Sequence, residues 1–116
     1  MAIVDTSAFI DSSKGNLAAK NALKAIEDSG EIISISSLTV FELSAGNPAG
    51  LDEARGKLVN ALRIINLNRE HAELAGILFR DLRKTGLEIS GADCMIAATA
   101  IIEKQALITR NAKHYA

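Results

Sequence analysis

Short runs of apolar residues alternate along the chain with segments whose apolar residues recur at helical spacing. The runs predict four β-strands, at residues 2–4, 32–35, 64–67 and 106–109. Within them the apolar residues are mostly consecutive and do not alternate with polar ones, which is typical of strands buried on both faces of a parallel sheet.

The segments with helical spacing predict five helices. They cover residues 16–29, a stretch opened by Ser36 and Ser37, and residues 51–62, 70–84 and 91–103. Glycines follow several of them as candidate ends, namely Gly30, Gly46 before Asn47-Pro48, and Gly86. The helix at 70–84 is strongly amphipathic, whereas the one at 91–103 is nearly all apolar, so we expect it to be buried on most sides.

Alternating strands and helices predict one α/β domain over residues 1–116, a three-layer α/β/α sandwich with a central parallel sheet. Open sheets of this kind bind ligands beyond the carboxyl ends of their strands. The residues at that edge are Asp5 and residues 36–37, 66–68 and 109–111. This edge is therefore where catalytic chemistry is expected.

Composition narrows the class of protein. Hydrophobic residues make up 48% and aromatic residues only 3% of the 116 residues, so the core must be aliphatic. The lone Cys94 excludes an intramolecular disulfide and is expected to be a buried structural thiol. No apolar run is long enough to cross a membrane, and no basic region precedes residues 2–4, so a cytoplasmic protein is expected.

The net charge of −1 argues against a wholly basic nucleic-acid-binding face. It leaves room for an enzyme that holds a short piece of RNA through a few basic side chains. Candidates for phosphate contacts are Arg80, Arg83, Lys84 and Arg110, although a solvated surface charge is the favoured interpretation of each one taken alone.

Three acidic residues carry the candidate chemistry, and each also has a structural interpretation. Asp5 follows the first strand, where aspartate is also a common cap or turn residue. Glu42 fits a capping box with Thr39, and Asp93 fits a capping pattern with Ser90. Together, however, Asp5, Glu42 and Asp93 lie at strand or helix ends that a parallel sheet brings to one edge. Carboxylates crowded there recruit a hard cation such as Mg²⁺ or Mn²⁺.

Four motifs, in order and across essentially the whole chain, resemble those of PIN domains, especially toxins of the VapC type. The first is Ile3-Val4-Asp5-Thr6-Ser7-Ala8-Phe9-Ile10, and the second is Phe41-Glu42-Leu43-Ser44-Ala45-Gly46. The third is Ala92-Asp93-Cys94-Met95-Ile96-Ala97-Ala98-Thr99-Ala100, and the fourth runs from Leu107-Ile108-Thr109-Arg110-Asn111 to Tyr115. Asp-Thr-Ser alone would mean little, but four motifs in sequence are a specific signal.

The resemblance implies a PIN-like sandwich that hydrolyses RNA phosphodiester bonds with Mg²⁺ or Mn²⁺, leaving a 5′ phosphate. Asp5, Glu42 and Asp93 match the family's acidic metal ligands, and Asn111 stands where many members carry a fourth carboxylate. Asn111 adds no charge, which puts a second metal in doubt. The hydroxyls of Thr6 and Ser7, with Arg110, are expected to orient the metal-bound water or to contact the substrate.

The same resemblance implies partners. VapC-like toxins pair with a small antitoxin, as in VapBC pairs, and many are homodimers, so both are expected here. Apolar residues between Leu38 and Leu62 are candidates for such a surface. Many members also continue into a further short strand beyond the fourth motif, which the sequence to Ala116 does not include.

Other interpretations remain open. A PIN-like fold kept as an inactive binding or scaffold module is the main alternative to a ribonuclease. A haloacid-dehalogenase-like phosphatase also starts from an aspartate after the first strand, but it usually carries a second aspartate where this chain has Ser7. No glycine-rich nucleotide-binding loop is present. His71 is expected to be a solvated residue beside Glu70 and Glu73, and His114 is a weak candidate for phosphate contact.

Overall fold

The computed structural model describes residues 2–13, 17–45 and 63–109. Their elements, in chain order, are β1 (Ala2–Val4), α1 (Thr6–Ser13), α2 (Leu17–Asp28), β2 (Ile33–Ser36), α3 (Ser37–Ala45), β3 (Arg63–Ile65), α5 (Arg69–Lys84), α6 (Gly91–Ile102) and β4 (Ala106–Ile108). The helix predicted at 51–62 and the turn Gly46-Asn47-Pro48 lie outside the described residues.

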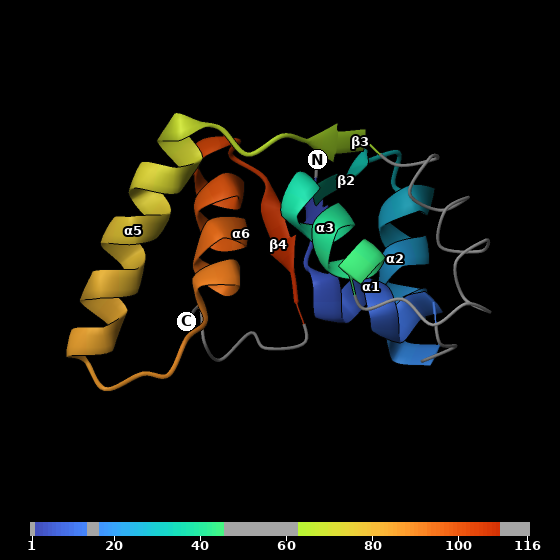
Figure 1. The fold of residues 1–116 in the computed structure, drawn as a ribbon. Helices are drawn as coiled ribbons and strands as arrows, with labels where there is room; N and C mark the ends of the chain where they lie inside the picture. The colour runs from blue at the N-terminus through green and yellow to red at the C-terminus, as the bar shows by residue number, and fades with distance from the viewer. Residues whose placement is uncertain (1, 14–16, 46–62, 110–116) are drawn as a thin grey trace.

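The four described strands form one parallel sheet in the order β3-β2-β1-β4 (Figure 1). The register pairs Ile3 of β1 with Ser34 of β2 on one side and with Leu107 of β4 on the other. The chain moves from β1 to β2 in one direction, but β4 lies on the opposite side of β1. The order therefore reverses between β1 and β4, and at such a switch point the carboxyl ends of the strands leave a crevice for ligands.

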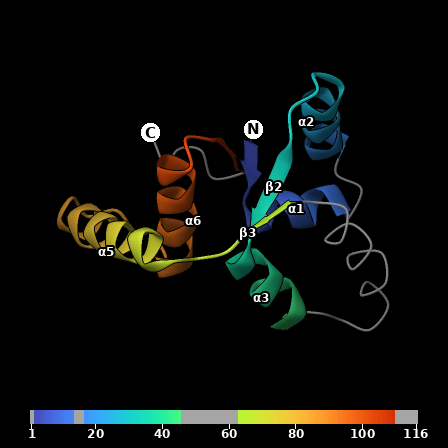
Figure 2. The ribbon, with the colours of Figure 1, turned by 90° about the horizontal axis from the view of Figure 1, so that it is seen from above.

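Helices cover both faces of the sheet, which confirms the predicted three-layer α/β/α sandwich. Figure 2 shows α1, α2 and α3 on one side of the strands, and α6 with α5 outside it on the other. Val4, Ile33 and Ile35 pack on the first side against Phe9 and Leu43. On the second side Ile3 and Ile65 pack with Ala100 of α6. Successive β1 residues thus serve opposite faces, so the strand is fully buried as its apolar run predicts.

The helix α1 is an element that the sequence pattern did not predict. Residues 6–13 contain little helical periodicity, but Asp5 caps the helix: its Oδ1 accepts a hydrogen bond of 2.8 Å from the backbone amide of Ala8. Aspartate is among the best N-cap residues because its carboxylate satisfies an amide that has no partner inside the helix. Asp5 therefore both ends β1 and starts α1.

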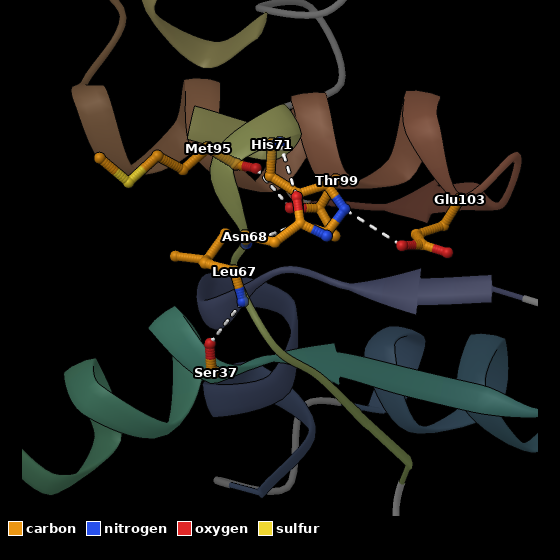
Figure 3. A network of polar contacts seen from close by, with 7 residues as sticks. All are labelled: Ser37, Leu67, Asn68, His71, Met95, Thr99 and Glu103. Carbon is orange, nitrogen blue, oxygen red and sulfur yellow. Dashed lines mark hydrogen bonds and ion pairs between the residues drawn. The ribbon is translucent and has the colours of Figure 1, made fainter. Parts of the chain in front are cut away.

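The prediction that His71 is solvated was wrong. Its side chain is completely buried, on the same stripe of α5 as Ala75. Nδ1 of His71 accepts a hydrogen bond from the amide of Asn68, and the Asn68 side chain accepts one from the amide of His71, which forms a reciprocal cap. Nε2 lies 3.1 Å from Oε1 of Glu103 at the end of α6 (Figure 3).

This network fastens the segment between β3 and α5 to both sides of the molecule. The amide of Leu67 donates to Oγ of Ser37 at the start of α3, while His71 reaches Glu103 (Figure 3). The chain must cross from one edge of the sheet to α5 here, so these contacts fix where α5 begins. The apolar set that makes α5 amphipathic packs on Cys94 and Ala98 of α6.

Within the part of the chain that the structure describes, no helix is long and apolar enough to span a bilayer. Cys94 is fully buried, which confirms the structural role expected for this thiol.

Candidate active site

Asp5 lies at the carboxyl end of β1, beside the switch point between β1 and β4. Its side chain is only 2% exposed. While Oδ1 accepts from the Ala8 amide at the start of α1, Oδ2 accepts a short hydrogen bond from the hydroxyl of Thr109, which follows β4. Both oxygens are therefore held, and the carboxylate is fixed at the crevice by two elements that are distant in sequence.

Glu42 is directed toward the same edge by hydroxyl groups. The hydroxyl of Thr6, the residue after Asp5, donates a hydrogen bond of 2.7 Å to Oε1 of Glu42. Because that hydroxyl has only one proton, its 3.0 Å contact with Thr39 uses the proton of Thr39. Thr39 is completely buried. The chain of hydroxyls from Thr39 through Thr6 thus orients the Glu42 carboxylate next to the residue that follows Asp5.

This arrangement corrects the capping-box interpretation of Glu42. The helix α3 begins at Ser37, so Thr39 lies inside it and is not its N-cap. The hydroxyl of Ser36 instead accepts a hydrogen bond from the amide of Leu38. Glu42, one turn further along, is left to interact across the structure with α1.

Asp93 lies in the first turn of α6, and its amide donates to Oγ of Ser90, the N-cap of that helix. The capping pattern predicted at Ser90 is thereby confirmed. The helix α6 runs back against the strand direction, because β4 follows it and is parallel to the others, so its N-terminus lies toward the carboxyl edge of the sheet (Figure 1). Two features raise the pKa of the neighbouring Cys94 thiol: first its burial, and second the negative charge of Asp93.

The PIN domain family model matches residues 2–116, nearly the whole chain. The chain belongs to the PIN domain family. Among curated relatives it is 32% identical over 115 residues to Ribonuclease VapC19 of Mycobacterium tuberculosis. The aligned residues cover 99% of this chain and 92% of that protein. It is 35% identical over 97 residues to Ribonuclease VapC3 of Methanocaldococcus jannaschii, which covers 84% of this chain and 95% of the relative.

Solved structures agree with this assignment. A toxin–antitoxin complex from Klebsiella pneumoniae contains a chain with a TM-score of 0.82 and 31% identity, covering 100% of this PIN domain and 91% of that chain. VapBC2 from Rickettsia felis, bound to a DNA fragment from its promoter, gives a TM-score of 0.83 at 25% identity, with 98% and 90% covered. The fold expected from the four motifs is confirmed.

The donor atoms at the edge of this PIN domain are suited to a hard divalent cation. They are carboxylate and hydroxyl oxygens, which Mg²⁺ and Mn²⁺ prefer, and they come from Asp5, Thr6 and Glu42. No group of three or more His, Cys, Asp or Glu side chains close enough to hold a metal ion occurs among the described residues. The structure thus does not bring Asp93 together with Asp5 and Glu42 in such a group, and the metal-binding role expected for these three acids stays a prediction.

The other predicted site residues are not hydrogen-bonded to Asp5 or Glu42 within the described part of the chain, or lie outside it. Ser7 is half-buried in the first turn of α1. Arg110, Asn111 and His114 lie outside the described residues. Arg80 lies beside Asp81 on the exposed face of α5, which favours the solvated interpretation of this charge.

Sequence reasoning missed the roles of Thr109 and Thr39. Thr109 was placed at the correct edge of the sheet because it follows β4, but nothing in the sequence connects it to Asp5. Thr39 was read as a helix cap. The only available signal was that each is a small hydroxyl residue within a few positions of the end of a strand, the region where polar side chains meet at the ligand edge.

Proposed function

We propose that this PIN domain is a divalent-metal-dependent endoribonuclease and the toxin of a toxin–antitoxin pair of the VapBC kind. The support is of two kinds. Its curated relatives carry the name Ribonuclease VapC, and the similar solved chains are in toxin–antitoxin complexes. The site itself contributes a carboxylate, Asp5, buried at the switch point of a parallel sheet.

The observation that carries the proposal is the burial of Asp5. A carboxylate that is 2% exposed is costly to keep charged, because it has lost most of its hydration. Two hydrogen bonds compensate part of that cost. No ion pair joins Asp5 to a cationic side chain among the described residues. A divalent cation would supply the missing positive charge, and the oxygen donors around Asp5 are suited to it.

In this mechanism Asp5, Glu42 and Asp93 would hold Mg²⁺ or Mn²⁺. When bound, the cation lowers the pKa of a coordinated water and neutralises charge on the phosphate. The protein's part is orientation: Thr109 and the Ala8 amide fix Asp5, and the hydroxyl of Thr6 fixes Glu42. Ser7, Arg110 and Asn111 are proposed to contact the substrate phosphate or the attacking water. Water attacks in line, the bond to the 3′ oxygen breaks, and the 5′ phosphate remains on the product.

The test compares RNA cleavage by the wild type with that of Asp5→Asn and Glu42→Gln. Both changes remove a charge but keep the shape. The glutamine at 42 can still accept from Thr6, and the asparagine oxygen at 5 can still accept from the Ala8 amide while its amino group faces the Thr109 hydroxyl, which can accept. We expect cleavage to require Mg²⁺ or Mn²⁺ and to fall at least 100-fold in either variant. Arg69→Gln serves as a control, since Arg69 is exposed at the start of α5 and pairs there with Glu73. Equal cleavage by wild type and Asp5→Asn would rule out the nuclease.

An inactive PIN-like scaffold is the competing function. Retention of Asp5, Glu42 and Asp93 argues against it, because a module that only binds has no use for a buried carboxylate that weakens the fold. The same assay decides: a wild-type protein that cleaves no RNA in either metal, while it still binds an antitoxin, would be a scaffold.

The antitoxin and a second copy of the chain are proposed partners. Phe41 on α3 is 65% exposed and lies between Leu38 and Leu62, where the sequence placed a partner surface. Ile64 on the edge strand β3 is 41% exposed and lies just beyond that range. Coexpression with the product of the neighbouring gene should give a stable complex. A chain that stays monomeric at high concentration and binds no such product would contradict both partners. The cytoplasmic location expected from the sequence stays a prediction.

A further inference from the structure

A cavity of ≈480 Å³ lies between the end of α5 and the start of α6, outside the cluster of Asp5, Thr6 and Glu42. The connection between these helices forms its wall, at the lower left of Figure 1. The residues that give the cavity its character are Phe79, Arg83, Leu87, Glu88, Ile89 and Ser90. Its volume is within the range of about 300–1,000 Å³ that small ligands occupy in proteins.

The lining combines a planar cation with an aromatic ring. The guanidinium carbon of Arg83 lies 5.2 Å from the centre of the Phe79 ring, a cation–π contact that holds the guanidinium over the ring. Leu87 is 44% exposed and Ile89 is buried beside it, which gives the cavity an apolar side. The cavity is open to solvent, so a flat, weakly polar group can rest in it against a planar and an apolar surface.

Glu88 decides which part of a nucleotide this cavity suits. Its exposed carboxylate repels a bare phosphate but accepts hydrogen bonds from hydroxyl and amino groups. A nucleobase stacks on aromatic rings and on guanidinium planes, and the ribose and the base supply the hydroxyl and amino donors. The cavity thus has the chemistry of a base and ribose site and not of a phosphate site.

The cavity is also in reach of the proposed active site. Ser90 lines it, and the same Ser90 hydroxyl accepts the hydrogen bond from the amide of Asp93. Three residues of helix separate the two positions, a rise of about 4.5 Å. Because α6 starts at the carboxyl edge of the sheet, its N-cap Ser90 places the cavity next to this edge, where the proposed RNA substrate would bind.

We propose that this cavity is a nucleotide subsite that takes the base and ribose of a residue flanking the cleaved bond in single-stranded RNA. Arg83 and Phe79 form the stacking platform, and Glu88 accepts from the sugar or base. The proposal rests on the proposed ribonuclease function and adds to it the form of the substrate: an unpaired nucleotide, because a base inside a duplex cannot enter the cavity.

The test measures binding without cleavage, in an Asp5→Asn background at 0.15 M salt. The probes are ten-nucleotide oligouridylate and oligoadenylate strands, each with one central 2-aminopurine, whose fluorescence is quenched when the base stacks. Arg83→Ala is compared with Arg80→Ala, which removes the same charge from the same helix but lies outside the cavity. We expect Arg83→Ala to weaken binding about 10-fold and to abolish the change in fluorescence, and Arg80→Ala to weaken binding less than twofold.

Two further variants separate stacking from charge and from folding. Arg83→Lys keeps the charge but loses the planar group, so it should also lose the fluorescence change. Phe79 packs partly against the core between α5 and α6, so Phe79→Leu, which keeps an apolar side chain, is used in place of alanine. Each variant is first checked for an unchanged melting temperature.

The outcomes distinguish this proposal from the proposed function. Equal loss in Arg83→Ala and Arg80→Ala would show a general charge effect and overturn the subsite, even if the wild type cleaves RNA. Loss of antitoxin binding in Arg83→Ala, with RNA binding intact, would assign the cavity to a protein contact instead. If the wild type cleaved no RNA while the stacking signal still depended on Arg83, the ribonuclease function would be wrong and the cavity would still be a nucleotide-binding site.

Discussion

The hydroxyl of Thr109 donates a hydrogen bond to Oδ2 of Asp5, although 104 positions separate the two residues in the chain. This contact joins the ends of β1 and β4, the two strands on either side of the switch point. The other oxygen of Asp5 caps α1. The carboxylate at the centre of the candidate site is therefore oriented by the first and last described strands together, and weakening either contact should affect catalysis before it affects folding.

Replacing Thr109 by valine should lower kcat about 10-fold, because the new side chain keeps the volume but no longer holds Oδ2 of Asp5. KM should change little, since Thr109 is a positioning residue. Thr109→Ser, which restores the hydroxyl, should recover most of the rate. Steady-state cleavage of an RNA substrate measures both constants.

The matched control for Thr109→Val is Thr99→Val. Thr99 is fully buried in α6 and donates to the carbonyl of Met95 within the same helix (Figure 3). Both variants lose one hydroxyl hydrogen bond, worth about 1 kcal/mol of stability. If Thr99→Val slowed cleavage as much as Thr109→Val, the effect would be on folding and not on the orientation of Asp5.

Asp5→Asn should be at least as stable as the wild type in the presence of a chelator. Asparagine caps helices as well as aspartate does and removes a buried charge. Asp5→Ala, which loses the cap, should cost about 1 kcal/mol relative to asparagine. Addition of Mn²⁺ should raise the melting temperature of the wild type, because a ligand of the native state stabilises it, and should leave Asp5→Asn unchanged. Parallel melting curves test all three statements, and an equal Mn²⁺ shift in both proteins would place the metal elsewhere.

The contact between His71 and Glu103 should not depend on the charge of Glu103. Nδ1 of His71 accepts from the amide of Asn68, so the ring proton is on Nε2 and faces Oε1 of Glu103. A glutamine offers the same acceptor, and we expect Glu103→Gln to cost less than about 0.5 kcal/mol. His71→Ala loses the reciprocal cap and leaves a cavity, which should cost about 2 kcal/mol or more. Urea unfolding compares the two, and a larger cost for Glu103→Gln would mean a charged imidazole.

The stability of the fold should decline at alkaline pH in part through Cys94. Its pKa is raised in the native state, first by burial and then by the charge of Asp93. The unfolded chain therefore ionises its thiol at lower pH than the native chain, and stability falls as pH rises through the ordinary thiol pKa of about 8.5. Cys94→Ala should flatten that part of the pH–stability profile. At neutral pH the native thiol should resist alkylating reagents that react once the chain is unfolded.

Most of the fold could be predicted from the sequence because most helices and strands have a recognisable local pattern of apolar residues. The strands β1 and β4 are apolar runs, and β2 and β3 each contain two isoleucines beside polar residues. The helix α5 has apolar residues at helical spacing, and α6 is nearly all apolar. The helix α1 was missed because its capping depends on one residue, Asp5, that also ends a strand. His71 was misread from its charged neighbours, although its spacing from Leu74, Ala75 and Leu78 puts it on the buried stripe of α5.

The site was less accessible to sequence reasoning for a physical reason. Asp5 and Glu42 were recognisable in combination and through the motifs that contain them, because each carboxylate alone also fits a capping role. Their surroundings are neutral hydroxyls. Thr39 and Thr109 have no unusual property in the sequence until the fold brings Thr39 against the hydroxyl of Thr6 and Thr109 against the carboxylate of Asp5. Pairings between residues 33 or 104 positions apart are set by strand order and register, which no local pattern encodes.

The central claim is that Asp5, with Glu42 and Asp93, holds a divalent cation. Diffraction from crystals soaked in Mn²⁺, collected at the manganese absorption edge, tests it directly. We expect an anomalous peak about 2.0–2.3 Å from a carboxylate oxygen of Asp5, with Asp93 and Glu42 in the first or second coordination sphere. A fully soaked crystal with no peak beside Asp5, or with its only peak at another group of acids, would contradict it.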